Sequence, residues 1–564
     1  MLRALLLAAA CFVIYLANLR LMGGWDTIPA RLLPISILRE GNVNLDEFPW
    51  LRRLTAEPYF LKVTSGGHLL SRYPVTVPLL VTPPYAAALW WLERHQVADD
   101  DVRFRLAVVV MERVNAAAIA AASVAMVLLA LHRLTSPSLA TGIAIVYAIG
   151  TNTWSTSSQA LYQHGPAELA LAGLSLCCLA EDRRRSVVAA ALFAAFGVLA
   201  RPTMAVFALV AVLFTWREHR RYRVAFAALA VLGGLALFAY NIAFFGRALG
   251  GYADIVRFFR WPGVTRLAGL LVSPSRGLFV YTPAALLSIP QMLRWRQAAR
   301  VWLRYAAAGV LGYLLLYTCF GGWWGGYAYG PRFLTDILPA LAILAAPTVE
   351  RLWQRTDGRV LLLLLATWGV VVQAIGVYCD DRSWDALPVP VDRSKGRLWD
   401  WSDPQIFRAL QAGWQGTELA GVLWQAFNDP QPVMLRSLTQ TDLAGSVMVA
   451  AAPALPWKDR GRAPLDLVVT NRSGVAWPAF SDYGLLQVQL VYIWWHEGQA
   501  LAGEGGFIKL PHNLGPGASD EVHVRVDPPR LPGTYELEFV ITQPLDLEKG
   551  VRGGASERTP IRIE

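Results

Sequence analysis

The first residue that could do chemistry is an acid directly beyond an apolar segment. Leu5 to Met22 is mostly apolar, and the sequence then reads Gly-Gly-Trp-Asp-Thr-Ile-Pro from Gly23 to Pro29. A carboxylate in this place, Asp26, could accept a proton from a hydroxyl group. An acid near a proline at a helix start is equally typical of a helix N-cap. The segment that follows, up to Arg39, is expected to lie along the surface as an amphipathic stretch.

Several basic residues between the apolar runs could bind an anion. Arg276 and Arg332 stand at expected helix starts, and Arg201 lies in a short Arg-Pro turn between two apolar runs. A guanidinium group forms forked hydrogen bonds with phosphate oxygens, although an arginine at a helix end can also simply extend its charge into water. Lys62 and Arg72 are further candidates, with ordinary loop charges as the alternative.

Four other side chains are candidates for substrate binding: His164, Tyr73, Trp324 and Tyr329. A histidine beside a Gly-Pro turn could also be a hydrogen-bonded loop residue. Aromatic rings between glycines can stack on sugars, but Trp and Tyr are also enriched at membrane interfaces. No cofactor and no metal site are predicted. The adjacent acids at 46–47 and 380–381 leave a divalent metal open, since neighbouring carboxylates alone are usually solvated.

The elements that must position these residues are apolar enough to cross a membrane. The 564 residues are 55% hydrophobic and only 16% charged, whereas about a quarter of a soluble domain is charged. The apolar runs are about 15 to 25 residues long, which matches the roughly 20 residues that span a bilayer. The sequence therefore predicts a polytopic α-helical membrane protein with about eleven crossings, at 5–22, 110–131, 137–153, 166–180, 186–200, 203–216, 224–245, 277–293, 301–320, 333–349 and 360–378.

Basic clusters between the apolar runs predict which face is cytoplasmic. They lie at 132–133, 183–185, 217–223, 294–300 and 351–359. The positive-inside rule puts these clusters and Arg3 in the cytoplasm, which requires Pro74 to Glu93 to lie on or in the outer leaflet without crossing. Its four prolines also argue against a regular spanning helix. Asp26, in an external loop at 23–109, then shares the outer face with the other candidate residues. The protein is expected in the cytoplasmic membrane, in contact with its lipids.

The composition changes after Tyr378, where short alternating strands replace the apolar runs. They include 465–470, 486–492 and 522–526, separated by Pro and Gly turns. We expect a transmembrane domain at 1–378, an external Trp-rich connector at 379–455 and an external, periplasmic immunoglobulin-like β-sandwich at 456–564. The five cysteines show no metal-binding spacing and are read as packing residues.

The helical part resembles the GT-C superfamily of integral membrane glycosyltransferases. The closest branch is that of bacterial protein mannosyltransferases and aminoarabinose transferases, which is similar to glycosyltransferase family 39. The stretches that carry the resemblance are Asp26 after the first helix, 71–74 (Ser-Arg-Tyr-Pro), 161–166, 273–279 and 329–336. In the tail, 471–477, 514–517 and 531–537 resemble accessory β-sandwiches of bacterial glycan-assembly proteins.

The resemblance implies an inverting glycosyltransferase that uses a polyprenyl-phosphate-linked sugar at the outer face of the membrane. Asp26 would be the general base, and the five cations named above would bind the donor phosphate. Because no second acid adjoins Asp26, the substrates of the mannosyltransferases do not carry over, and a glycan, lipid or protein acceptor stays open. A glycolipid transporter or flippase and a non-catalytic glycan-binding scaffold remain alternatives. Neither a P-loop nor a dinucleotide fingerprint is present, and no nucleic-acid partner is expected.

Overall fold

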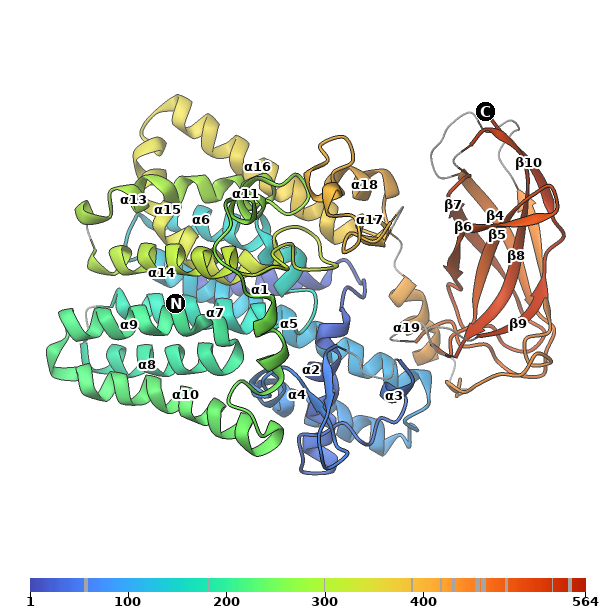
Figure 1. The fold of residues 1–564 in the computed structure, drawn as a ribbon, viewed down its shortest axis with the longest axis horizontal. Coiled ribbons are helices and arrows are strands. Elements are labelled where there is room, and N and C mark those ends of the chain that lie inside the picture. Colours follow the sequence, from blue (N-terminus) through green and yellow to red (C-terminus); the bar gives the residue numbers. More distant parts are fainter. Residues whose placement is uncertain are drawn as a thin grey trace. The chain divides into compact units, whose positions relative to one another are not determined.

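The chain forms two compact units (Figure 1). The structure is a computed structural model that describes residues 1–564 except 55–58, 181–182, 299, 387–388, 416–417, 429–431, 452–456, 458–462, 482–484, 530 and 546–549. The helical unit comprises Met1–Glu47, Tyr59–Ala86 and Met111–Gln415. The β unit comprises Phe48–Pro58, Ala87–Val110 and Gly416–Glu564. Each unit is therefore assembled from three separate segments of the chain.

Five apolar helical segments in the described part of the chain are long enough to cross a membrane. They are α5 (Val102–Leu131), Arg220–Phe245 with α10 (Arg223–Phe245), α14 (Val301–Thr318), Arg332–Trp353 with α15 (Leu338–Trp353), and α16 (Thr356–Tyr378). The remaining helices up to residue 300 are α1 (Leu2–Leu16), α2 (Ile28–Arg39), α3 (Leu51–Leu54), α4 (Thr76–Arg94), α6 (Pro137–Ile149), α7 (His164–Cys178), α8 (Arg183–Ala200), α9 (Ala205–Glu218), α11 (Val264–Val272), α12 (Leu278–Tyr281) and α13 (Ile289–Leu293). Three more follow α16: α17 (Ser383–Ala386), α18 (Gln405–Ala412) and α19 (Glu418–Asn428).

Each expected crossing contains helical residues, but the number eleven stays a prediction. The expected crossing at 277–293 is divided into α12, a 3₁₀ turn at Pro283–Ser288 and α13. Prolines at 283 and 290 stand at the starts of the second and third pieces, where their missing N–H groups cannot continue the preceding helix.

Two of the four prolines do not interrupt helix α4, and the expectation that the prolines argue against a spanning helix is not contradicted. Pro83 and Pro84 lie inside a continuous helix from Thr76 to Arg94. They remove the donors that would bond to the carbonyls of Leu79 and Leu80, two residues with exposed side chains. The helix is not among the five long apolar segments, and its predicted place in the outer leaflet stays untested.

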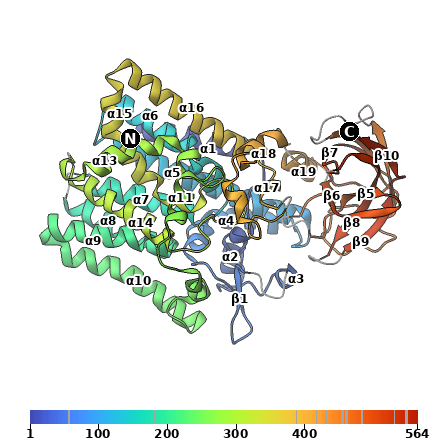
Figure 2. The same ribbon diagram turned by 45° about the horizontal axis from the view of Figure 1, so that its top comes forward.

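Helix α2 carries the chain away from Asp26 through the interior of the helical unit. All residues from Ile28 to Ser36 are buried, so α2 does not present the wet face expected of an amphipathic surface stretch. Arg31 forms a buried ion pair with Glu112 of α5, with 2.9 Å between Nη1 and Oε2. Beside α2 lies a short hairpin of β1 (Leu61–Val63) and β2 (Leu69–Ser71), visible in Figure 2.

Small residues let α16 approach its neighbours closely. A methyl group at Gly369 would lie 2.6 Å from the carbonyl oxygen of Gly150, and one at Gly376 would lie 2.3 Å from the ring of Tyr329. Close backbone contact at small residues is a common way for apolar helices to pack.

The β unit contains two antiparallel sheets that share one core. One sheet has the order β10-β8-β5-β6, with β9 also paired to β8, and the other has the order β3-β4-β7. The strands are β3 (Gly445–Ala451), β4 (Ala463–Asn471), β5 (Gln489–His496), β6 (Gln499–Lys509), β7 (Ser519–Val526), β8 (Gly533–Pro544), β9 (Gly550–Ala555) and β10 (Thr559–Ile563). Leu467 and Val524 of one sheet join Trp494 and Phe539 of the other in a single cluster. The immunoglobulin-like topology stays a prediction. Strand β3 lies within the expected connector at 379–455, so the described strands begin before residue 456, where the β-sandwich was expected to start.

Candidate functional site

Asp26 is the centre of a hydrogen-bonded cluster in the helical unit. The hydroxyl groups of Tyr59 and Tyr73 donate to its Oδ1 at 2.6 and 2.8 Å, and Nη1 of Arg332 lies 2.8 Å from its Oδ2. The side chain of Asp26 is 16% exposed. Asp26 is not the N-cap of α2, because Thr27 holds that position. The partners of Asp26 come from distant parts of the chain, so its place in the cluster is set by tertiary structure.

The surroundings of Asp26 keep its carboxylate ionised. Burial by itself would raise the pKa of Asp26, but the charge of Arg332 and the hydrogen bonds from Tyr59 and Tyr73 outweigh burial. The pKa of Asp26 is therefore below its usual value. The group is a carboxylate, ready to accept a proton, at any ordinary pH.

Turns and a hairpin bring the cluster together. Asp26 lies in a 3₁₀ turn (Trp25–Thr27) after two glycines, and a methyl group at Gly24 would lie 2.8 Å from the hydroxyl of Tyr162. Tyr59 precedes β1 and Tyr73 follows β2, so the hairpin brings both hydroxyl groups to the same oxygen. Arg332 begins a 3₁₀ turn two residues after Gly330, whose φ of +71° suits glycine.

A second cluster surrounds the buried carboxylate of Asp336. Nδ1 of His164 lies 2.6 Å from Oδ1 of Asp336, and Arg201 forms an ion pair with Oδ2. The hydroxyl of Tyr313 donates to Oδ2 as well. Arg201 also donates to the hydroxyl of Tyr317 at 2.9 Å. Three segments that are far apart in sequence thus place an acid, a guanidinium and an imidazole in direct contact.

Gln163 lies between the two clusters. Its Oε1 accepts a hydrogen bond from the hydroxyl of Tyr252 at 2.9 Å and a long one from Arg201 at 3.5 Å. The ring of Tyr252 lies 6.3 Å from that of Tyr73, centroid to centroid. Gln163 and Asp26 line one small cavity together with Ala30, Ser71, Tyr73, Pro74, Val77, Pro78 and Leu161.

Two donors at this site have no acceptor among the described residues. They are Nε of Arg332 and Nε2 of Gln163, both buried. A buried donor without a partner costs roughly 1–3 kcal/mol, which a bound oxyanion would offset. The guanidinium of Arg332 also lies over the ring of Tyr162, 5.6 Å from its centroid. The site can therefore offer a base and at least one cationic donor to the same ligand.

Arg72 and Lys62 lie on the hairpin that carries the two tyrosines. Nε of Arg72 donates to the carbonyl of Leu61 at 2.9 Å, and its Nη1 pairs with Asp254 at 3.3 Å. Lys62 pairs with Leu70 in the β1–β2 ladder, and its ammonium group forms no hydrogen bond or ion pair with the described residues. Their predicted contact with a donor phosphate stays a prediction.

Arg276 lies in a different, closed environment. All five of its N–H donors are taken, by the carbonyls of Trp324, Ser275 and Gly326, by Oε1 of Gln405 and by Oδ1 of Asp385 at 2.6 Å. The side chain is 1% exposed. Burial raises the pKa of Asp385 to about 6, against the opposing effect of Arg276. Because no donor of Arg276 is left for a ligand, we leave this residue out of the proposed donor site.

The aromatic candidates near Arg276 also have protein partners. The hydroxyl of Tyr329 donates to the carbonyl of Val372 at 2.8 Å, and the side chain is buried. Nε1 of Trp324 donates to Asp392 at 2.8 Å, and the ammonium group of Lys395 lies 4.7 Å from its ring centroid. Of the sequence candidates, the structure thus brings Asp26, Tyr73 and Arg332 together, with Arg201 and His164 in the adjoining cluster.

Tyr59, Gln163 and Asp336 are site residues that were not predicted. Asp336 and Gln163 stand within stretches that carry the family resemblance, 329–336 and 161–166, so those stretches were a signal. Tyr59 precedes the hairpin in an ordinary loop, and no pattern in the sequence marks it.

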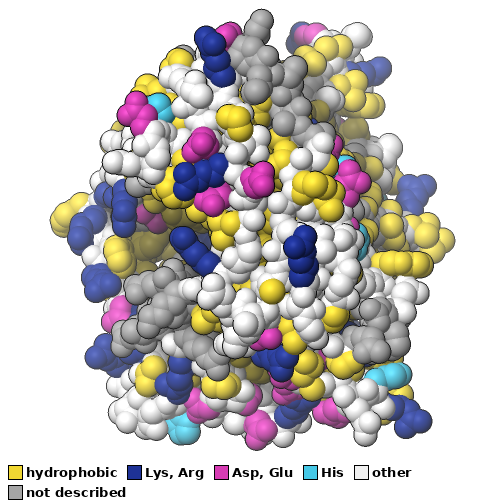
Figure 3. All heavy atoms as spheres, turned by 90° about the vertical axis from the view of Figure 1, so that its right-hand side faces the viewer, with side chains coloured by type: hydrophobic (Ala, Val, Ile, Leu, Met, Phe, Trp, Pro, Cys, Tyr) yellow, Lys and Arg dark blue, Asp and Glu magenta, His cyan; other side chains and the backbone are white. Residues whose placement is uncertain are grey.

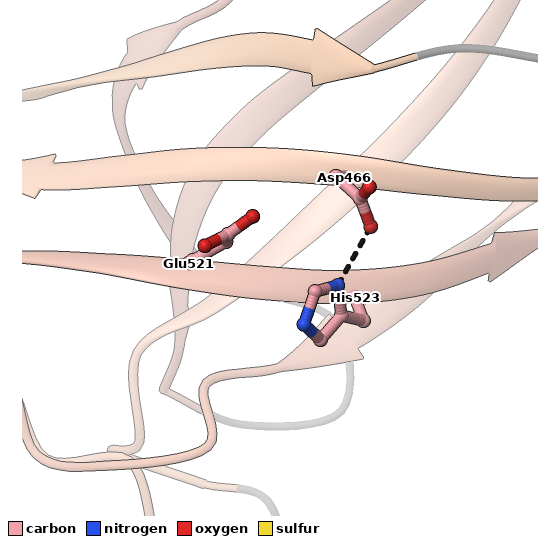
Figure 4. A group of neighbouring side chains, drawn as sticks. All are labelled: Asp466, Glu521 and His523. Atoms are coloured by element: carbon pink, nitrogen blue, oxygen red, sulfur yellow. Dashed lines mark hydrogen bonds and ion pairs between the residues drawn. The ribbon is translucent and has the colours of Figure 1, made fainter.

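Among the described residues, the Asp26 cluster contains no group of three potential metal ligands. Asp46 pairs with Nδ1 of His68 at 2.6 Å and accepts from the amide of Leu69. In the described part of the chain, only Asp466, Glu521 and His523 of the β unit bring three potential ligand atoms within 4.8 Å of one another (Figure 4). This group is largely exposed, and on the face drawn in Figure 3 acidic and basic side chains are interspersed. Such exposed groups are common without an ion, so no metal is assigned.

Comparison with known proteins gives a remote structural similarity. No family model and no curated protein matches the sequence. Among solved structures, the chain is similar to the crystal structure of ArnT from Cupriavidus metallidurans in the apo state. The two share 14% sequence identity and a TM-score of 0.40, over 74% of this chain and 70% of ArnT. We base the function on the residues of the site.

Proposed function

We propose that the helical unit is a glycosyltransferase that moves a sugar from a polyprenyl-phosphate-linked donor to an acceptor at the outer face of the cytoplasmic membrane. The observation that supports this most is the Asp26 cluster: a carboxylate held by two tyrosine hydroxyls and a guanidinium beside a cavity. The cluster supplies the two groups that such a transfer needs, a base for the acceptor and a cation for the departing phosphate.

The reaction is a single displacement with inversion. The acceptor hydroxyl gives its proton to Asp26 as its oxygen bonds to the anomeric carbon. The bond from that carbon to the phosphate oxygen breaks, and the polyprenyl phosphate leaves with the electron pair. Arg332 stabilises the negative charge that grows on the phosphate.

Arg332 couples donor binding to the basicity of Asp26. In the structure its Nη1 pairs with Asp26, while its buried Nε has no acceptor among the described residues. A phosphate that bonds to Arg332 competes with Asp26 for the guanidinium. Because Arg332 lowers the pKa of Asp26, weakening their contact makes the carboxylate a stronger base once the donor is bound. Gln163 lines the same cavity, and its Nε2, which has no acceptor among the described residues, is a further donor to the phosphate.

The test is the substitution Asp26→Asn with Asp46→Asn as the matched control. Asp46 is also an external-loop acid but pairs with His68 away from the cluster. Losing a general base reduces transfer by about 10²–10⁴-fold. Cells that lack the protein are supplied with each variant, and their envelope glycans, glycolipids and glycoproteins are compared by mass spectrometry.

A third variant separates chemistry from folding. Tyr73→Phe removes one hydrogen bond to Asp26 but leaves the carboxylate in place. We expect it to retain most of the transfer, as Asp46→Asn does, while all three proteins accumulate in the membrane. Full restoration of the glycan by Asp26→Asn would remove Asp26 from the mechanism.

A further inference from the structure

Two short helices of the helical unit carry apolar side chains that the described residues leave exposed. On α18, Phe407 and Leu410 recur at the spacing of one helical face and are exposed, and Trp414, two residues after the last helical residue, is exposed as well. The opposite face, with Ile406 and Ala409, is buried. On α11, Val264 and Leu267 are exposed in the same manner, and Trp261 just before it is 90% exposed.

The position of α18 along α16 sets its depth. Ile406 and Ala409 pack in one cluster with Val372, and Ile375 packs against that cluster. These two residues of α16 lie three and six positions before its last residue, Tyr378, which is about 4.5 and 9 Å inside the helix end at 1.5 Å per residue. The ring of Trp414 stacks on Tyr378, 4.7 Å between centroids. Interfacial amphipathic helices lie about 5–10 Å deep in the boundary between headgroups and acyl chains.

Helix α11 occupies the corresponding place at the end of α14. The carbonyl of Thr318, the last residue of α14, accepts from the amide of Gly263 at 3.2 Å and from Nε of Arg266 at 2.6 Å. Since α14, α15 and α16 follow one another as long apolar helices, the ends of α14 and α16 lie on one side of the bilayer. Both exposed apolar faces therefore lie at the same membrane boundary.

Charge near α11 matches a phospholipid surface. Arg257 and Arg260 are exposed, and they alternate with the exposed aromatic residues Phe258, Phe259 and Trp261. Apolar rings at the acyl boundary with guanidinium groups at phosphate level are the arrangement found at membrane interfaces. A partner protein would require no such depth or cation pattern.

We propose that α18 and the segment from Val256 to Leu267 are immersed in the outer leaflet and bind phospholipid directly, with Phe407, Leu410, Trp414, Trp261 and Val264 among the acyl chains. This surface anchors the chain after α16 to the bilayer. It does not depend on the enzymatic activity proposed above.

The experiment places the photoreactive residue p-benzoylphenylalanine at position 407, at position 261 and, as control, at Ser65 in the exposed turn of the β1–β2 hairpin. Phe407 is replaced by a similar aromatic group, and Trp261 is almost fully exposed, so neither change disturbs the core. The full-length protein is irradiated in native membranes and analysed by mass spectrometry.

We expect phospholipid adducts at positions 407 and 261 that are at least several-fold more abundant than at position 65. Adducts to another protein at 407 or 261 would overturn the proposal in favour of a docking surface. Absence of lipid adducts above the level at position 65, in protein that accumulates normally, would overturn it in favour of a solvent-exposed face.

Discussion

Three arginines that look alike in the sequence differ in how many donors they have left. Arg276 has none, Arg201 is committed to Asp336 and Tyr317, and Arg332 keeps a buried Nε without an acceptor among the described residues. A sequence shows the charge of an arginine but not the acceptors around it. The difference between a structural and a ligand-binding cation is therefore visible only in three dimensions.

Arg276→Gln and Arg332→Gln should consequently fail in different ways. Arg276→Gln leaves Asp385 buried without its partner, and breaking such a pair costs about 3–5 kcal/mol, so we expect poor accumulation and a lower melting temperature. Arg332→Gln should fold, because its cluster is partly exposed. It should lose about 1.5–3 kcal/mol of interaction with the phosphate, or roughly 10–100-fold in kcat/KM for the donor. Thermal unfolding and donor kinetics check this, and equal melting temperatures for the two variants would contradict it.

The pH dependence of transfer should report on Asp26. Because the pKa of Asp26 is below its usual value, the carboxylate stays ionised as pH falls from 7 to 5, and its titration should cause no loss of transfer in that range. Arg332→Gln removes a group that lowers this pKa, so the acid limb of its residual activity should move to higher pH. Tyr73→Phe should shift it less in the same direction. An unchanged acid limb in Arg332→Gln would show that Arg332 does not act on the base.

The candidate site could be predicted in part. The sequence singles out Asp26 as an acid at the end of an apolar run, with a helix N-cap as the alternative, and Arg332 by its position at an expected helix start. The sequence does not show that both residues share one cluster with Tyr73. Tyr73 lies 47 positions after Asp26 in the chain, and Arg332 lies 306 positions after it. The hydrogen bond between Tyr252 and Gln163 likewise joins residues that are far apart in the sequence.

At the scale of the elements, the packing of α16 against its neighbours requires two glycines, Gly369 and Gly376, in addition to an apolar sequence. Hydropathy predicts the crossing at 360–378, within the helix at Thr356–Tyr378, but does not show which face meets a neighbour. The broken crossing at 277–293 and the continuous helix through Pro83 and Pro84 show the same limit. Whether a proline interrupts a helix depends on where the freed carbonyls lie, which the sequence does not state.

Gly369→Leu should destabilise the packing of α16. Its side chain would meet the backbone of Gly150, where even a methyl carbon lies 2.6 Å from a carbonyl oxygen, so the backbone must move. We expect a melting temperature several degrees lower in detergent. Val371→Leu, two positions away with an exposed side chain, is the matched control and should leave it unchanged. Equal stability of both variants would show that the close contact at Gly369 does not matter.

At the scale of the molecule, the proposed chemistry requires that all residues of the site lie on the outer face of the membrane. An impermeant thiol reagent should label Ser65→Cys and Ser402→Cys in intact cells. It should label Ser136→Cys, in the turn between α5 and α6, only after permeabilisation, because the adjacent basic cluster is expected in the cytoplasm. The wild-type protein, with its five native cysteines, gives the background. Opposite accessibility of positions 65 and 402 would put the hairpin beside Tyr59 and Tyr73 and the chain after α16 on different faces of the bilayer, which contradicts the common outer face.

The β unit draws two of its three segments from the N-terminal part of the chain, and this affects biogenesis. Val102, Leu106 and Val109 belong to the same apolar cluster as the strands after residue 445. During synthesis these side chains emerge more than three hundred residues before the strands that bury them. These apolar side chains stay exposed, or are bound by a chaperone, until translation is almost finished. A chain that terminates before the last strand would expose an aggregation-prone apolar surface next to the membrane, which quality-control proteases could recognise.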